Sequence, residues 1–193
     1  MSRRRWHTWG WIGVFALAAS AVWIESAASA PDSSSVTQRL LGPLARPLAS
    51  AQWVRVDLAL RAGRTDLALA RAETAIELDP GLSLGWISLA RHVAFELASP
   101  ETEVDPQRRL TWRRAALALA ARGERTASDP GLLAFWQGLI LFHAAQVDPE
   151  LPWPGGRPAV LQAAVAHFER AATLGDPDAP DAARAARSLL RER

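Results

Sequence analysis

The sequence predicts an all-α protein with an N-terminal transmembrane helix, and three observations support this fold class. Residues 6–24 carry no formally charged side chain. The rest of the chain repeats alanine and leucine at intervals of three and four residues, which is the spacing of one helix face. Asp-Pro turns at residues 79–81, 129–131 and 176–177 interrupt this pattern. A series of helices is therefore expected after the N-terminal segment.

The first 25 residues are interpreted as a signal-anchor. A helix over residues 6–24 would span about 28 Å, close to the hydrocarbon thickness of a bilayer. Tryptophans stand at both of its ends, and the arginines at positions 3–5 predict a cytoplasmic N-terminus with the rest of the chain exported. A cleaved signal peptide is the alternative, because Ala28-Ser29-Ala30 offers small residues. Pro31 directly after them is a poor context for cleavage, so the anchor is favoured.

The remaining chain is divided into a linker and one domain. Residues 26–38 are rich in alanine, serine, proline and aspartate, and we expect a flexible linker there. Residues 39–193 form the expected helical domain. The sequence pI of 10.7 follows from the absence of lysine and tyrosine rather than from a large charge, since the net charge is only +2. No nucleic-acid partner is therefore expected.

An internal repeat is the most informative feature of the domain. Residues 79–86 read DPGLSLGW and residues 129–136 read DPGLLAFW, fifty positions later. In both copies proline precedes tryptophan by six residues, and leucine follows the tryptophan by three, as Leu89 and Leu139. We expect Trp86 and Trp136 to lie on equivalent helices that stack as successive units.

These residues resemble the tetratricopeptide repeat, a helix-turn-helix unit. Trp86, Leu89 and Ala90 match the first helix of a unit, and Ala164 and Phe168 match the second helix of another. Ala68, Ala72, Ala75 and Pro80 match the second helix of the first unit and its end. Residues 98–106 and 147–158 depart from the pattern as insertions. The resemblance implies a short right-handed α-solenoid, in which residues 178–193 form a capping helix.

The layout also resembles a group of bacterial proteins with one membrane helix and divergent repeats of this kind, which has no assigned activity. Gly42-Pro43-Leu44, Gly63-Arg64 and Leu78-Asp79-Pro80 contribute to that resemblance. It implies a single-pass protein of the cytoplasmic (inner) membrane, with the repeat domain on the periplasmic side.

The repeat resemblance also implies a concave surface lined by the first helix of each unit. The residues that it assigns to this surface are Trp53, Asp57, Arg61, Ile87, Arg91, Phe95 and Gln137. We therefore expect a membrane-tethered protein–protein interaction module, a scaffold or adaptor, whose partners belong to a membrane complex. The alternative is an accessory structural subunit of such a complex, held by its transmembrane helix and its repeat domain.

The sequence contains no pattern that predicts an enzyme. The four histidines, His7, His92, His143 and His167, have no metal-ligand spacing, and there is no cysteine. Nucleotide-binding loops and nucleophile motifs are also missing from the sequence. We expect no catalytic residue, no metal and no cofactor.

Two further features stay open at this point. Arg108, Arg109, Arg113 and Arg114 surround Trp112, and they either bind an acidic group or form a solvated helix face. Trp153 lies in a proline-rich segment, where it either anchors a partner or folds back onto an apolar patch of the domain.

Overall fold

The structure is a computed structural model that describes residues 36–148 and 151–191. Every regular element of these residues is helical. The elements are α2 (Val36–Leu41), η1 (Gly42–Leu44), α3 (Ala45–Arg61), α4 (Thr65–Leu78), α5 (Ser83–Arg91), η2 (His92–Leu97), α6 (Pro106–Glu124), α7 (Pro130–Val147), α8 (Gly156–Thr173) and α9 (Ala179–Arg191). The predicted all-α class is confirmed for this part of the chain. The predicted anchor lies outside the described residues.

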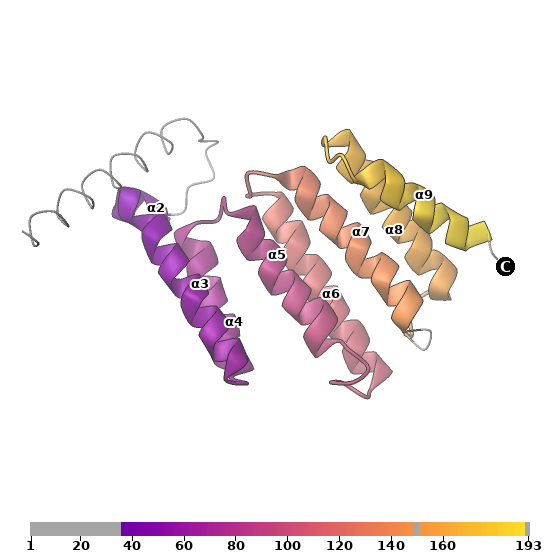
Figure 1. The fold of residues 1–193 in the computed structure, drawn as a ribbon, viewed down its shortest axis with the longest axis horizontal. Helices are drawn as coiled ribbons and strands as arrows, with labels where there is room; N and C mark the ends of the chain where they lie inside the picture. Colours follow the sequence, from indigo (N-terminus) through magenta and orange to yellow (C-terminus); the bar gives the residue numbers. More distant parts are fainter. Residues whose placement is uncertain (1–35, 149–150, 192–193) are drawn as a thin grey trace, which may run out of the picture.

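The long helices pack as sequential pairs (Figure 1). α3 packs on α4, α5 on α6, and α7 on α8, while α9 lies against α8 at the end of the array. Successive pairs also touch, because α5 contacts both α4 and α7, and α6 contacts α7. The irregular connections after η2 and after α7 fall within the two segments that were predicted as insertions.

The two Asp-Pro-Gly-Leu turns lie side by side, as the internal repeat predicts. The backbone N–H of Ser128 donates to the carbonyl of Gly81 at 2.9 Å, and the N–H of Asp129 donates to Oγ of Ser83 at 3.0 Å. Their helices start differently, however. α7 begins at proline with Asp129 as its N-cap, whereas α5 begins only at Ser83, three residues after the corresponding proline. The repeat is thus equivalent in placement but not in local backbone.

Small residues allow the helices of each pair to approach closely. In the first pair Ala68, Ala72 and Ala75 are at most 1% exposed. In the later pairs glycine has this role. A Cβ atom on Gly123 would lie 2.6 Å from Cγ of Trp86, and one on Gly138 would lie 2.6 Å from the ring of Phe168. An aromatic ring on one helix therefore fills the space that the missing side chain leaves on the other.

The structure differs from the predictions at the start of α2 and in the helix type of η2. α2 begins at Val36, so residues 36–38, which were predicted as part of a flexible linker, are helical. η2 is a π-helical segment that continues α5, and no sequence pattern predicted it.

In the part of the chain that the structure describes, no helix is both long and apolar enough to cross a bilayer.

Candidate partner-binding groove

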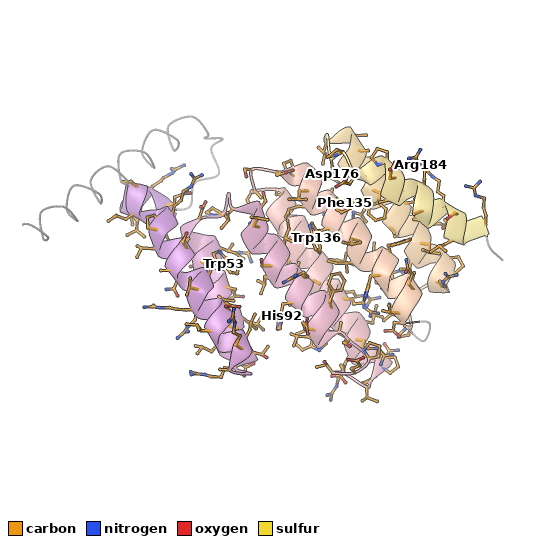
Figure 2. The ribbon with its side chains drawn as sticks, viewed as in Figure 1. Trp53, His92, Phe135, Trp136, Asp176 and Arg184 are labelled. Atoms are coloured by element: carbon orange, nitrogen blue, oxygen red, sulfur yellow. The ribbon has the colours of Figure 1, made fainter. Side chains whose placement is uncertain are left out.

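A groove separates the first helix pair from the second. It has a volume of about 600 Å³, and its walls come from α3 and α4 on one side and from α5 and η2 on the other. The charged side chains on its walls are Asp57, Arg91 and Glu96, so both signs of charge are present. Figure 2 shows Trp53 and His92 on the two facing sides of this region.

Trp53 reaches across the groove from α3 to α5. A Cβ atom on Gly85 would lie only 2.6 Å from Cζ2 of the indole, so the ring rests directly on the backbone of α5. Only glycine at position 85 permits this approach without displacing the ring. The indole Nε1 is buried, yet it has no hydrogen-bond partner among the described residues. A buried donor without a partner costs about 1–3 kcal/mol.

The opposite wall carries His92 and Phe95 on the π-helical segment. Burial lowers the pKa of His92, and the charge of Arg91 lowers it further, while Glu96 opposes the shift. The imidazole is therefore neutral at neutral pH, with one donor and one acceptor nitrogen. Its Nε2 is a second buried ring nitrogen without a partner in residues 36–148 and 151–191. π-helical turns inside α-helices occur frequently at functional sites.

Phe95 connects the groove to the third helix pair. Its ring centroid lies 4.7 Å from that of His143 and 6.4 Å from that of Trp136, and both of these residues belong to α7. Burial lowers the pKa of His143, and the nearby charge of Arg113 lowers it further. The wall formed by η2 is thus joined through Phe95 to a larger aromatic cluster that includes Trp136 and His143.

The structure brings together four of the residues predicted to face a partner. Trp53, Asp57, Arg91 and Phe95 all line the groove. Arg61 is exposed beyond this lining, and it forms an ion pair with Asp57 at 2.7 Å.

Two of the other predicted residues are buried inside the helix array. Ile87 is 6% exposed and packs in the core between α5 and its neighbours. Gln137 is 3% exposed, and its Nε2 donates to Glu124 at 2.8 Å. The expectation that these two side chains face a concave surface was wrong, because both are buried between neighbouring helices of the array.

The groove contains residues that the sequence analysis missed. Leu84 and Ser88 are exposed on α5 and line it. Counting back from Phe95 in steps of four, three and four residues gives Arg91, Ser88 and Leu84, which is one face of a helix. The sequence also contains this spacing. A step of four residues back from Arg91, in place of three, selects Ile87 rather than Ser88, however, and both steps are compatible with a helix.

Trp153 lies apart from these groove residues, in the connection between α7 and α8. It is partly buried and packs against the core cluster that α7, α8 and α9 form. The guanidinium of Arg114 lies 5.8 Å from the centre of its ring. Of the two interpretations left open, the structure shows the one in which this tryptophan folds back onto the domain.

The arginine cluster on α6 is divided by burial, because Arg108 and Arg114 are exposed whereas Arg109 and Arg113 are buried. Arg109 and Arg113 are 4% and 2% exposed, and both bind the carboxylate of Asp148 at 2.8 Å. Burial alone would raise the pKa of Asp148, but the hydrogen bonds from Arg109 and the charge of Arg113 outweigh it and hold the pKa below its usual value. The two arginines therefore join α6 to the C-terminal end of α7.

The described residues contain no group of three or more histidine or acidic side chains placed to hold a metal ion. Comparisons of the chain with family models, with curated proteins and with solved structures find no match.

Proposed function

We propose that this protein is a membrane-tethered protein–protein interaction module that binds a helix or peptide segment of a partner in the groove between its first two helix pairs. One observation carries the proposal. The groove combines apolar area from Trp53 and Phe95 with two buried ring nitrogens, on Trp53 and His92, that have no partner in the described chain. A bound segment would cover the former, and a turn of each ring toward the segment would let it satisfy the latter.

The size and the charges of the groove suit a short helical or extended segment. Its lining runs from Leu82 to Glu96 along α5 and η2, which corresponds to about 21 Å of helix. A partner segment of three to four turns has about that length. A main-chain or side-chain oxygen of the segment would accept from Nε1 of Trp53. Arg91 and Glu96 are exposed on the same wall and would pair with charges beside the segment's apolar face.

The proposal includes the architecture that the resemblance implies. The helix pairs form a short right-handed solenoid of tetratricopeptide-like units, and the sequential packing and the adjoining twin turns support it. Residues 6–24 anchor the chain in the cytoplasmic membrane, with the repeat domain on the exported side. The support for this anchor is the uncharged segment with its flanking arginines and tryptophans. Tethering raises the local concentration of the groove near other membrane proteins, so a weak contact suffices.

Site-specific photo-crosslinking in membranes tests the groove. A photoreactive residue at position 84, where the leucine is 64% exposed on the groove wall, should cross-link to a partner. The same residue at position 104, where Val104 is 81% exposed outside the groove, should not. In the variant with the photoreactive residue at position 84, an added Arg91→Ala substitution should weaken the cross-link. The helix content measured by circular dichroism should not change.

Two results would contradict the groove assignment. Equal cross-linking from positions 84 and 104 would show that the contact is unspecific. Co-purification of a partner at fixed stoichiometry in mild detergent, unchanged by Leu84→Glu, would favour the accessory-subunit alternative, in which the groove has no part.

A further inference from the structure

Exposed apolar side chains are concentrated at the N-terminal end of the described domain. Ten large hydrophobic residues are exposed among the described residues, and six of them lie on α2, η1 and α3. We call these six the N-terminal apolar face: Val36, Leu40, Leu44, Leu48, Val54 and Leu58. Their exposed fractions range from 43% to 83%. Such clustering is unusual, since exposed hydrophobic residues are normally scattered singly.

This face belongs neither to the core nor to the groove. Leu44 and Leu48 are four residues apart, as are Val54 and Leu58, which is the spacing of a helix surface. The residues of α3 that are buried are Ala45, Ala49, Val56 and Ala59. None of the six apolar residues lines the groove. α3 therefore has a buried side, a groove side and a third side that is apolar and exposed.

The charges around this face are mostly positive. Residues 36–61 contain four arginines (Arg39, Arg46, Arg55 and Arg61) and one acidic residue (Asp57), and Asp79 pairs with Arg46 at 3.4 Å, which gives 4 − 2 = +2. An apolar face flanked by arginine is the composition of helices that lie in the interface of an anionic bilayer. A second copy of the chain is a poorer match, because face-to-face contact would bring two such cationic segments together.

The sequence also places this face close to the membrane, provided that residues 6–24 form the proposed anchor. Eleven residues, 25–35, separate the end of that segment from Val36. A chain of that length reaches at most about 40 Å when fully extended, and about 18 Å on average if it is flexible. α9, at the other end of the array, has no such constraint (Figure 1).

We propose that the N-terminal apolar face lies against the surface of an anionic lipid bilayer, with its leucines and valines at the level of the head groups. This inference rests on the anchoring in the proposed function. Trp53 and Asp57 point to the groove from a different side of α3, so the membrane contact leaves the groove open. The domain is thereby oriented on the membrane rather than suspended from its linker.

The absence of cysteine makes a direct test possible, because any cysteine introduced by substitution is unique. Leu44→Cys and Leu58→Cys, in the full-length chain, would carry an environment-sensitive fluorophore. Leu174→Cys is the matched control, since Leu174 is 44% exposed at the far end of the array. Each protein is reconstituted into phosphatidylcholine vesicles, with and without phosphatidylglycerol, that contain a spin-labelled lipid as quencher.

The expected result is a blue shift and strong quenching at positions 44 and 58 in vesicles with phosphatidylglycerol, and neither at position 174. Arg55→Gln should reduce the quenching at position 58, and high salt should do the same. Leu40→Glu should abolish the quenching at position 44 without changing the circular dichroism spectrum.

Three outcomes would overturn the inference. Absence of quenching at positions 44 and 58 in a chain that resists alkaline extraction would refute the bilayer contact while leaving the anchor intact. Loss of the chain on alkaline extraction would instead refute the anchor. Pyrene excimers from Leu44→Cys that form equally in detergent and in vesicles would show that a second copy covers this face.

Discussion

The two ends of the described helix array differ in what they present to their surroundings. At the C-terminal end, α9 buries Ala179, Ala183 and Ala186 and leaves an outer side that carries Arg184 and Arg187. At the N-terminal end, the outer side of α2 and α3 carries leucine and valine. An array of helix pairs needs a polar cap at each end to stay soluble. The described C-terminal end has such a cap, and the described N-terminal end presents apolar side chains instead.

The interiors of the two ends differ as well. The largest fully buried side chains are Trp86, Arg113, Leu133, Ile140, Leu161 and Phe168, and all of them lie on α5 to α8. The first pair is held mainly by alanines, with Val56, Ile76 and Leu78 as its larger buried residues. The groove lies at the boundary between these two kinds of packing. Beside the groove, Trp86 and Leu89 of α5 pack against Ile76 of α4, so one core cluster still joins the two pairs.

The largest expected effect comes from removing the buried carboxylate of the C-terminal part. Asp148→Ala leaves Arg109 and Arg113 buried without their counter-ion, and we expect a loss of about 3–5 kcal/mol in the free energy of unfolding. Asp57→Ala removes the exposed partner of Arg61 in the first pair and should cost no more than about 1 kcal/mol. Urea unfolding of both variants measures the difference. Similar losses of unfolding free energy in the two variants would contradict the expected difference between the buried and the exposed ion pair.

A second comparison uses two glycines that face aromatic rings. Gly138→Ala forces a Cβ atom to 2.6 Å from the ring of Phe168, which is fully buried and has no room to move. We expect a loss of about 1–3 kcal/mol. Gly85→Ala meets Trp53 at the same distance, but that ring is only partly buried and can shift into the groove. A smaller loss is expected at position 85, together with a changed tryptophan fluorescence.

The histidines should make the stability depend on pH below their ordinary pKa of about 6.5. Burial lowers the pKa of His143, so the unfolded chain binds a proton more readily than the folded chain below pH 6.5. Stability should therefore fall as the pH falls from 6.5, and it should level off below the folded pKa. His143→Gln should flatten the slope in thermal melts. An unchanged slope would assign the effect to His92 and His167, whose pKa values burial also lowers.

The smallest expected effect concerns the N-terminal apolar face itself. Leu58 is 58% exposed, so Leu58→Ser should change the free energy of unfolding by less than about 0.5 kcal/mol. Leu190 packs against the core from α9, and Leu190→Ser should cost more, about 1 kcal/mol. A large loss for Leu58→Ser without membranes would show that this face is already covered in solution.

Much of the fold was predictable from local patterns. Asp-Pro-Gly turns, helical spacing of alanine and leucine, and the insertions between paired helices all appear where the sequence places them. These features act within a few residues of one another, so no tertiary information is needed to recognise them.

The candidate site was predictable only in part. Trp53 and Phe95 were identified through the repeat resemblance, but the rotation of α5 decides that Leu84 rather than Ile87 lies beside them. Both residues fit a helical face that includes Arg91. Only the packing of α5 against α3 and α6 selects between the two faces.

The sequence by itself determined that the described part of this chain forms successive helices and where the Asp-Pro turns between them fall. The tertiary structure decided which arginines of α6 are buried, because their carboxylate partner, Asp148, is 35 and 39 residues away. It also decided which side of α3 faces the groove and which is left exposed. Such choices depend on contacts between distant helices, and a pattern of spacing along one helix cannot distinguish its neighbours.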